Sequence, residues 1–427
     1  MIDYNPISPG TSWYEDALEE RPSYPVISEH IQCDVAIIGG GFTGLSAAYH
    51  LAKEGMSVVL CEASRFGDGA SGRNGGQLGT GQRQWVETLE KKYGFERSKA
   101  LFDLAEEAKR DILSWCAMPD CNIDFMVGQL SVTHKKREIR AYQQHVETLQ
   151  RYGYHGLTSM DKAEVDERLG SSFYQGGIYD ADTGHINPLK LIIWLAQKAK
   201  KAGAKLYEKT QATAVEQNNG KCIVTTKRGN ITAENILLAT NAYNLGLQHF
   251  VEKNIVSIRS YIGATEPLPK HSSILPRGEA VDDSRFMVRY FRKSIDNCLL
   301  FGGVESYDNQ HPVNLGARIG RQIIEVYPQL QSINLTHYWG ATVAITVERM
   351  PYVRQLKPGI TYCGGYSGHG VTLAPFMGKL YAEWLSGKHE RFKYFQDLKI
   401  SSFPGGKILR FPLVFLAMNW FSLMDRF

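Results

Sequence analysis

The sequence of 427 residues lacks the features that mark several common classes of protein. No run of about eighteen apolar residues occurs, so no transmembrane helix is expected. The first ten residues contain neither the basic stretch nor the apolar stretch of a secretory signal, so we expect a cytoplasmic location. The GxSxG and Walker A motifs are also absent, which leaves a hydrolase or an NTPase without support.

Cysteine usage and charge exclude further classes. Seven cysteines are scattered along the chain without a CxxC pair, which argues against a disulfide framework and a structural zinc site. The closest pair, Cys116 and Cys121, has Pro119 between its members and fits a turn better than a metal site, so no metal is expected. The net charge of +4 is small and comes with no stripe dense in lysine and arginine. Nucleic acid is therefore not an expected partner.

What is present indicates a two-domain globular protein. The chain is too long for one ordinary hydrophobic core, and its 43% hydrophobic and 22% charged residues are an ordinary globular balance. Near the start, a strand at 34–38, a helix at 44–55 and a strand at 57–62 form a β-α-β unit. Its two strands should be parallel, with a right-handed crossover.

A glycine-rich turn, GGGFTG at 39–44, joins the first strand to the helix. Gly39 permits the tight turn, Gly41 lets the backbone approach a pyrophosphate, and Gly44 lets the helix pack closely on the strand. The helix N-terminus offers unpaired N–H groups and a positive dipole end to the phosphates. Glu62 ends the second strand, where it can accept hydrogen bonds from a ribose. The unit predicts a dinucleotide site; the acid disfavours NADP but does not separate NAD from FAD.

A second glycine-rich stretch, GDGASGRNGGQ at 67–77, follows the second strand. Its glycines free the backbone to lie against a flat ligand, and Ser71, Arg73 and Asn74 offer hydrogen-bond donors. A plain surface loop is the alternative interpretation. An NAD-dependent dehydrogenase has no need of such a loop, so the stretch favours a flavin.

A third glycine-rich stretch, GGYSGHGVT at 364–372, lies at a strand-to-helix junction near the C-terminus. It would aim backbone N–H groups at the N1/C2=O edge of a flavin, which becomes anionic on reduction. His369 is a candidate contact to flavin or substrate, and a capping or structural histidine is the alternative. Tyr366 and Trp339 are candidate walls of an aromatic pocket, which would keep a substrate amine neutral by desolvation.

The order of elements predicts an α/β fold in which a discontinuous Rossmann-type domain is interrupted by a mostly antiparallel β substrate domain. We expect helices over 85–116, 136–152 and 188–203, and mostly short strands over 255–345. The expected boundaries are an N-terminal arm at 1–27, an FAD-binding domain at 28–90, 155–247 and 338–398, a substrate domain at 91–154 and 248–337, and an apolar tail at 399–427.

The motifs together resemble the D-amino-acid-oxidase-like family of FAD-dependent oxidoreductases, which includes glycine oxidase and monomeric sarcosine oxidase. The resemblance runs from about Trp13 to the end of the chain. It is carried by CDVAIIGGGFTGLSAAYHLA, GASGRNGGQ, GHINPLKL at 184–191, LLATNAY at 237–243 and GGYSGHGV at 364–371. Within the family, the GRNGGQ loop and FPGGKILRFP at 403–412 are most similar to the polyamine-catabolic enzymes related to gamma-glutamylputrescine oxidoreductase.

The resemblance implies a glutathione-reductase-like FAD-binding domain of the DAO subtype and oxidation of a C–N bond. The substrate would be a gamma-glutamylputrescine-like polyamine derivative or an amino acid. It would be oxidised by hydride transfer to flavin N5, and the imine would hydrolyse to an aldehyde or keto product. Oxygen, a quinone or another acceptor would take the electrons. Sarcosine-oxidase relatives attach FAD through a cysteine, but here WGATVAITVE has Ala341 or a neighbour at that place, so non-covalent FAD is expected.

The expected site residues follow from the motifs and the resemblance. The candidates for catalysis or for contact with substrate or flavin are His369, Tyr366 and Arg73. The expected FAD contacts are Gly39, Gly41, Phe42, Thr43, Gly44, Glu62, Ala63, Ser71, Gly72, Arg73, Asn74, Gly75, Gly76, Gln77, Ala212, Thr240, Asn241, Gly365, Ser367, Gly368, His369, Gly370, Val371 and Thr372. No general base is identified.

Two other functions stay open. A flavin-dependent dehydrogenase of a hydroxy acid would need an Arg/Lys cluster facing the flavin, for which Arg285, Arg289 and Arg292 are candidates. Tyr290, Arg292 and Lys293 are otherwise expected at the surface. The third hypothesis is a non-catalytic FAD-binding subunit. The apolar C-terminal tail is expected to pack on the FAD-binding domain, and contact with a membrane or a partner subunit is the alternative.

Overall fold

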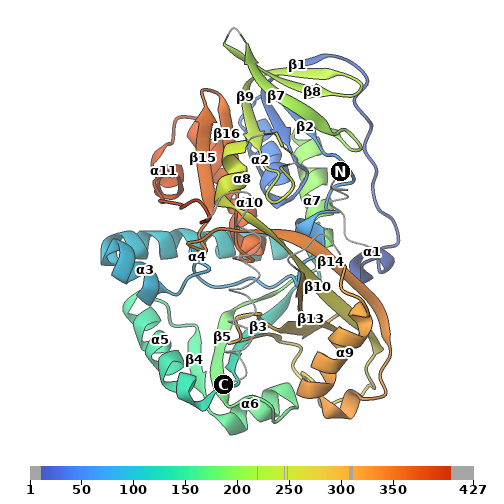
Figure 1. Ribbon diagram of the computed structural model, residues 1–427, viewed down its shortest axis with the longest axis vertical. Coiled ribbons are helices and arrows are strands. Elements are labelled where there is room, and N and C mark those ends of the chain that lie inside the picture. The colour runs from blue at the N-terminus through green and yellow to red at the C-terminus, as the bar shows by residue number, and fades with distance from the viewer. Residues whose placement is uncertain (1–10, 219, 245, 248, 307–310, 405–427) are drawn as a thin grey trace.

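A computed structural model describes residues 11–404 of the chain, apart from 219, 245, 248 and 307–310. Most of the predicted apolar tail therefore lies outside the described residues. The described chain forms two sheets, one in the upper half of Figure 1 and one in the lower half, with α4 (Phe95–Cys116) running between them. Within these residues, no helix combines the length and the apolar character needed to cross a bilayer.

The first sheet is the expected dinucleotide-binding sheet. Its order is β15-β16-β9-β1-β2-β6, and β7 and β8 form a hairpin whose second strand pairs with β9. Neighbouring strands from β16 to β6 are parallel, while β15 pairs antiparallel at the edge. The strands are β1 (Ile31–Ile38), β2 (Val58–Cys61), β6 (Lys205–Tyr207), β7 (Ala212–Asn218), β8 (Lys221–Thr226), β9 (Asn230–Leu238), β15 (Tyr352–Lys357) and β16 (Ile360–Gly364).

Segments far apart in the sequence build this sheet, because β16 pairs with β9 and β9 with β1. The strands are almost continuously apolar, as expected of parallel strands that are buried on both faces. The helices α2 (Phe42–Lys53), α7 (Pro188–Lys201) and α10 (Gly370–Leu385) contribute buried side chains to the same core. The predicted α/β fold with a discontinuous first domain is confirmed.

The second sheet has the order β14-β10-β13-β12-β11-β3-β5-β4. It is antiparallel except for the pair β3–β11. Its strands are β3 (Met126–Thr133), β4 (Leu157–Met160), β5 (Gly176–His185), β10 (Val256–Pro267), β11 (Ala280–Asp283), β12 (Tyr290–Lys293), β13 (Cys298–Ser306) and β14 (Leu335–Ile345).

One face of the second sheet is apolar and is covered by helices. Phe291, Phe301 and Tyr261 share a buried cluster with Ile319 and Ile323 of α9 (Leu315–Val326). The remaining helices are α1 (Trp13–Asp16), α3 (Val86–Tyr93), α5 (Ile139–Arg151), α6 (Lys162–Leu169), α8 (His249–Asn254) and α11 (Glu390–Gln396), with short 3-10 turns at Ala70–Gly72, Lys136–Glu138 and Pro328–Leu330. The opposite face of this sheet is turned towards the first domain; it is polar on β3, β11 and β12, and it carries a buried apolar cluster on β10, β13 and β14.

Three sequence expectations differ from the structure. The helix expected over 85–116 is broken at Gly94, whose φ of +79° leaves the helical region, so α3 and α4 are separate helices. α9 lies inside the stretch 255–345, for which mostly strands were expected. The strands β4 and β5 lie in the second sheet, although the expected boundaries put 155–247 in the first domain, because β5 pairs antiparallel with β3. The domain boundaries themselves stay a prediction.

Candidate cofactor and active site

The first glycine corner joins β1 to α2 with almost no space for side chains. Gly39 has a φ of +110°, and a Cβ there would come within 2.7 Å of the carbonyl oxygen of Ala239. A Cβ on Gly44 would collide with the carbonyl of Gly39, so helix and turn pack backbone to backbone. The local geometry therefore matches the predicted roles of the two glycines, a tight turn at Gly39 and close packing at Gly44.

The second glycine loop reaches the N-terminus of α2. Gly41 is the N-cap and supplies no side chain, while Ser71 Oγ accepts a hydrogen bond of 3.1 Å from the Phe42 N–H. A Cβ on Gly41 would lie 2.8 Å from the same oxygen. The corner therefore brings a hydroxyl, a glycine backbone and a helix N-terminus to one point, which fits a pyrophosphate.

Glu62 closes the other side of this corner. Its Oε2 accepts 2.7 Å from the Gly40 N–H and its Oε1 accepts 2.9 Å from the Ser64 N–H. Burial raises the pKa of Glu62, and these backbone hydrogen bonds oppose the rise. Each carboxylate oxygen retains a second lone pair, so the residue suits the diol of a ribose. Ala63 follows it at an exposed position.

The loop over 67–77 has its shape fixed by Asn74. The Asn74 amide donates to the carbonyls of Ala70 and Ser71 at 2.9 and 2.8 Å, and its Oδ1 accepts 2.8 Å from the Gly76 N–H. Asn74 therefore organises the loop with its own side chain. Arg73 Nε donates 2.8 Å to the Gly340 carbonyl, which ties the loop to β14.

Arg292 holds this loop from the second sheet and is the main correction to the predicted surface residues. It is 4% exposed rather than at the surface, because its guanidinium donates to the carbonyls of Gly75 at 2.6 Å and Ile186 at 3.0 Å. It also donates 3.1 Å to Tyr14 Oη, and Tyr14 donates 2.7 Å to the Asn74 carbonyl. We call Tyr14, Arg292 and the carbonyls that they bind the loop clamp.

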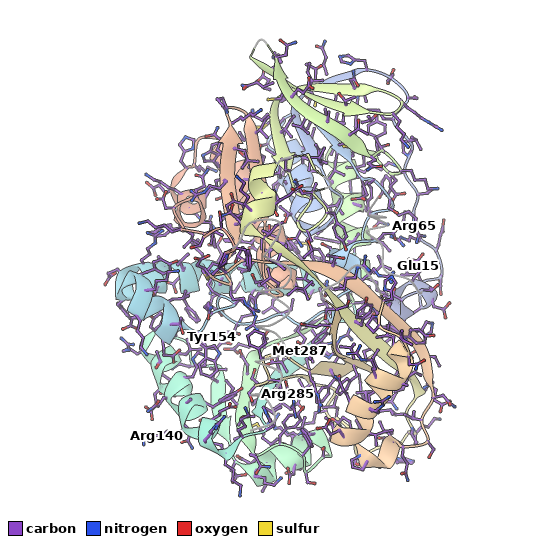
Figure 2. The ribbon with its side chains drawn as sticks, in the orientation of Figure 1. Glu15, Arg65, Arg140, Tyr154, Arg285 and Met287 are labelled. Carbon is purple, nitrogen blue, oxygen red and sulfur yellow. The ribbon has the colours of Figure 1, made fainter. Side chains whose placement is uncertain are left out.

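The N-terminal arm belongs to the same structure. Glu15 pairs with Arg65 at 2.8 Å, and the two side chains approach each other at the right of Figure 2. Trp339 lies under the arm, fully buried, with its ring 5.4 Å from that of Tyr14 and its indole N–H donating 3.0 Å to the Arg73 carbonyl. The expected wall residue Trp339 is thus bonded to the loop.

The third glycine stretch meets the first one directly. The hydroxyls of Tyr366 and Thr43 are 2.6 Å apart, and Ser46 Oγ donates 2.6 Å to the Pro375 carbonyl. The Gly365 N–H donates 2.9 Å to Asn241 Oδ1 from the end of β9. The sequence motifs at 39–44, 237–243 and 364–372 are therefore brought together at the carboxyl ends of parallel strands, where ligands bind in such sheets.

The start of α10 leaves backbone donors available. The Ser367 N–H is used by the Ala344 carbonyl at 3.0 Å, and the His369 N–H by the Tyr366 carbonyl at 3.0 Å. Gly370 and Val371 begin the helix, and no side chain caps it, so their N–H groups have no partner within the helix. Among the N–H groups that the third glycine stretch was expected to aim at a flavin, those of Ser367 and His369 are therefore already used.

His369 is held as a neutral side chain. Its Nε2 lies 2.9 Å from the Gly81 carbonyl, to which only a protonated nitrogen can donate. Burial, helped by the positive charges of Arg83 and Lys109, lowers the pKa of His369 to about 4. A neutral imidazole with its proton committed to Gly81 suits a positioning role better than that of an acid.

Six buried hydroxyls have no hydrogen-bond partner within the described residues, and two of them belong to predicted FAD contacts. These two are Thr240 Oγ1 at the end of β9 and Thr372 Oγ1 in the first turn of α10. Unsatisfied buried hydroxyls are uncommon and call for a ligand or water. Together with the glycine corners, they fit FAD. Ala212 is buried at the start of β7 and contributes no side-chain donor.

A buried polar network joins α4 to the loop that contains Thr80 and Gly81, and the sequence did not predict it. Lys109 is 2% exposed, and its Nζ donates to Thr80 Oγ1 at 2.7 Å, Tyr154 Oη at 2.9 Å and Glu106 Oε2 at 2.8 Å. Glu106 Oε1 accepts 2.9 Å from the Gly81 N–H. These hydrogen bonds from α4 therefore fix the loop whose Gly81 carbonyl bonds His369. The available signal was a Lys–Glu pair at i, i+3 within an apolar helix face.

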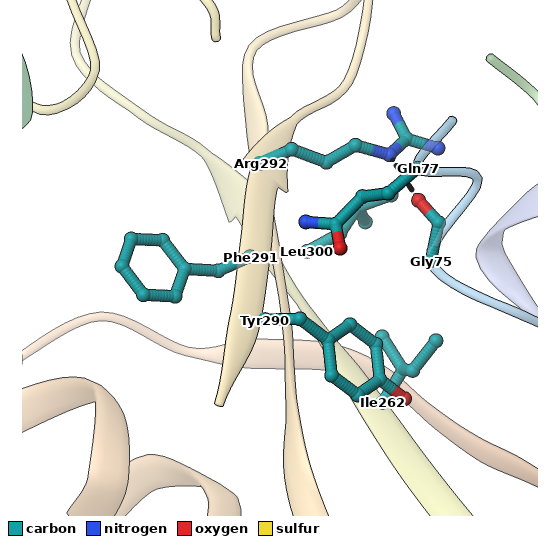
Figure 3. Close-up of a pocket in the computed structure, with 7 residues that line it drawn as sticks. All are labelled: Gly75, Gln77, Ile262, Tyr290, Phe291, Arg292 and Leu300. Atoms are coloured by element: carbon teal, nitrogen blue, oxygen red, sulfur yellow. Dashed lines mark hydrogen bonds between the residues drawn. The ribbon is translucent and has the colours of Figure 1, made fainter. Parts of the chain in front are cut away.

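The polar face of the second sheet lies against the 67–77 loop. Gln77 Nε2 donates 2.8 Å to the Val281 carbonyl, and Tyr290 Oη lies 3.1 Å from Ser260 Oγ. Figure 3 shows Tyr290, Arg292 and Gln77 around a cavity of about 10 Å³, the size of a single water molecule. The lining residues are Gly75, Gln77, Ile262, Tyr290, Phe291, Arg292 and Leu300.

Comparisons with known proteins agree with this geometry. The model of the family described as FAD dependent oxidoreductase matches residues 34–384. A protein described as probable oxidoreductase OrdL from Rhizobium meliloti is 51% identical over the full length of both chains. Gamma-glutamylputrescine oxidoreductase of Escherichia coli is 33% identical, covering 97% of this chain and 98% of that protein. The structure of glycine oxidase from Geobacillus kaustophilus superposes with a TM-score of 0.73 at 21% identity, covering 86% and 99%.

Proposed function

The chain belongs to the family of FAD-dependent oxidoreductases, and on that premise we propose that it oxidises an amine at a C–N bond. The product is an imine, which water hydrolyses to an aldehyde and a free amine. The proposed substrate is a polyamine derivative of the gamma-glutamylputrescine type. Its support is the relative of that name, which matches nearly the whole chain.

We propose that FAD is bound without a covalent bond. Ala341 lies in β14, and its side chain offers no nucleophile. Acid precipitation of the purified protein should therefore leave a yellow supernatant and a colourless pellet. A pellet that keeps the flavin absorbance would overturn this part of the proposal.

When bound, FAD supplies an acceptor for two electrons and the hydrogen of the carbon next to nitrogen. The residues of the chain would position the substrate and stabilise the charge that develops during the reaction. The N–H groups of Gly370 and Val371 offer positive charge at the start of α10, where a group that gains negative charge would be stabilised. His369 stays neutral and keeps the 79–81 loop against α10. The buried surroundings of Tyr290 and Trp339 favour an uncharged amine, which has a free electron pair.

The arginines that favoured a hydroxy-acid dehydrogenase are engaged elsewhere. Arg285 pairs with Asp283, and Arg289 donates 2.6 Å to Glu325, while both guanidiniums lie over Phe173. Arg292 belongs to the loop clamp. Arg285 and Arg292 are thus engaged, and Arg289, whose Nη1 has no partner among the described residues, pairs with Glu325 of α9 on the face of the sheet that the helices cover.

The single observation that carries the proposal is the convergence of the motifs at 39–44 and 364–372, joined through Thr43 and Tyr366. Anaerobic titration tests it: gamma-glutamylputrescine should bleach the visible flavin band, while lactate and glycerol 3-phosphate should not. If a hydroxy acid bleached the flavin band, a hydroxy-acid dehydrogenase would take the place of the proposed amine oxidation. A flavin that no substrate reduces would indicate a non-catalytic subunit. Reoxidation of the bleached protein in air then separates an oxidase from a dehydrogenase.

A further inference from the structure

Arg83 stands out among the charged residues near the site because its charge has no counter-ion in contact. It is half-buried in the loop after Leu78, and no hydrogen bond or ion pair to its guanidinium occurs among the residues that the structure describes. Burial lowers the pKa of Arg83, and the charges of Asp282 and Glu305 oppose that effect. A guanidinium that is partly desolvated and lacks direct partners is costly unless a ligand supplies them.

The position of Arg83 is fixed by its neighbours in the loop. Gly81 bonds to Glu106 through its N–H and to His369 through its carbonyl, each at 2.9 Å. Gln82 donates 2.8 Å to the Leu101 carbonyl, and Gln84 donates 3.3 Å to the Glu348 carbonyl. The side chains on both sides of Arg83 are thus bonded to other elements, and the side chain of Arg83 is left for a ligand.

Asp282 offers the opposite charge on the polar face of the second sheet. Its Oδ2 accepts from Gln129 Nε2 at 2.5 Å and from Ser131 Oγ at 3.0 Å. Both of these bonds use the same oxygen, so within the described residues Oδ1 is left without a donor. Asp282 is a cross-strand partner of Tyr290, so the two side chains share the face that meets the 67–77 loop.

Contacts link the loop of Arg83 to Asp282, because Thr80 Oγ1 donates 2.5 Å to Asp180, and Gln129, the cross-strand partner of Asp180, donates to Asp282. Arg83 comes from the loop that binds His369, and Asp282 follows Val281, whose carbonyl accepts from Gln77. Their charges influence each other, because the guanidinium of Arg83 lowers the pKa of Asp282 while burial raises it. Lys109 and Asp180 are excluded as alternative charged groups for binding a ligand, since both are hydrogen-bonded within the network that joins α4 to the loop.

We propose that Arg83 and Asp282 form a subsite for the zwitterionic head of the substrate, an α-amino acid group at the end opposite the oxidised C–N bond. Arg83 binds the carboxylate through its paired N–H groups, and Asp282 Oδ1 accepts from the ammonium. The inference rests on the proposed function and deepens it, because it assigns the residues that separate an amino-acid-bearing polyamine from a simple diamine. It concerns recognition and leaves the chemistry of the C–N bond unchanged.

The test compares two substrates on the FAD-loaded enzyme. For Arg83→Gln, KM for gamma-glutamylputrescine should rise about tenfold to a hundredfold, while kcat changes by less than about threefold. Activity with putrescine, which lacks the head group, should not change. Arg83→Lys should recover part of the loss, and Asp282→Asn should shift KM in the same direction. Arg140→Gln on the outer helix α5 (Figure 2) removes the same charge at an exposed position and is the matched control.

A second readout does not depend on turnover. Titration with L-glutamate should perturb the absorption spectrum of the bound flavin in the wild-type protein, and Arg83→Gln should weaken that binding by a similar factor. If the wild type does not oxidise gamma-glutamylputrescine but L-glutamate binding still needs Arg83, the subsite stands and the proposed substrate falls. If Arg83→Gln leaves both KM and L-glutamate binding unchanged, or lowers kcat equally for both substrates, the subsite is overturned. No spectral response in the wild type counts against it as well.

Discussion

The hydroxyl groups of Thr43 and Tyr366 lie 2.6 Å apart although 323 residues separate them in the chain. Both side chains are buried, one in the first turn of α2 and the other just before α10. Because both side chains are buried, removing one hydroxyl takes away the hydrogen bond of the other. The bond therefore fixes the two ends of the discontinuous domain against each other at the proposed FAD site.

Replacing one partner of this pair should cost nearly as much as replacing both. Tyr366→Phe leaves the Thr43 hydroxyl buried without a partner, so we expect a loss of about 1–3 kcal/mol in the free energy of unfolding. In the double variant Thr43→Val/Tyr366→Phe, the second change should add little. Urea unfolding of the four proteins in a double-mutant cycle measures the coupling, expected at about 1–3 kcal/mol because the second loss is not added to the first. Simple additivity of the two single losses would contradict a direct bond.

The crossing of α2 and α10 predicts a strong effect at Gly378. A Cβ there would meet the backbone of Thr43 and would lie 2.6 Å from the Ala47 nitrogen, and backbone atoms of a packed helix cannot move aside. Gly378→Ala should therefore destabilise the protein by about 1–3 kcal/mol or more.

Gly320 in α9 is the matched control for that substitution. No atom lies within 4 Å of a Cβ added there, so Gly320→Ala should stabilise by about 0.5–1 kcal/mol through helix propensity alone. Thermal melts of both variants against the wild type check the pair. Equal shifts of the two melting temperatures would mean that α2 and α10 do not cross as closely as described.

The glycine corners could be predicted from the sequence because their requirements are local. Gly39 needs a positive φ and Gly44 has no room for a side chain, and each condition belongs to a strand, a turn and a helix within a few residues. The loop clamp could not be predicted, since Arg292 binds the carbonyls of Gly75 and Ile186, and any residue supplies a carbonyl. An arginine that binds backbone looks the same in the sequence as an arginine at the surface.

The assignment of strands to the two sheets also could not be predicted from the local sequence pattern. A strand pattern does not show which sheet a strand joins, and only the pairing of β5 with β3 decides that β4 and β5 belong to the second sheet. The network around Lys109 was closer to prediction. Glu106 and Lys109 interrupt the apolar face of α4 formed by Ala105, Ala108 and Ile112, and buried charges of this kind occur in pairs.

The loop clamp predicts that the N-terminal arm contributes to FAD affinity. Tyr14→Phe removes the bond to the Asn74 carbonyl and the acceptor of Arg292, so the loop that carries Ser71 loses two constraints. The dissociation constant for FAD should rise about threefold to tenfold, measured by quenching of flavin fluorescence on titrating the apoprotein. Tyr394→Phe on the exposed side of α11 is the control, and an equal change in both variants would show that the arm has no specific role.

His369 predicts a particular dependence of stability on pH. In the unfolded chain a histidine takes up a proton near pH 6.5, but burial keeps the pKa of folded His369 at about 4. The folded-state pKa is depressed, so the stability due to neutral His369 is present above pH 6.5 and is lost as the pH falls towards 4. Between these values one extra proton bound by the unfolded chain gives a slope of about 1.4 kcal/mol per pH unit.

His50 and His185, whose pKa values burial lowers to about 4 and about 3, act in the same direction, so the wild-type slope is the sum of several groups. His369→Gln keeps a donor for the Gly81 carbonyl and removes the titration, so its free energy of unfolding should fall less steeply by about 1.4 kcal/mol per pH unit. Denaturant unfolding of the FAD-loaded protein at several pH values between 6.5 and 4 measures the slope. Exposed His155→Gln should leave it at the wild-type value. A His369→Gln slope equal to that of the wild type would mean that the imidazole is charged in the fold, and the hydrogen bond to Gly81 would then have to be donated by an imidazolium.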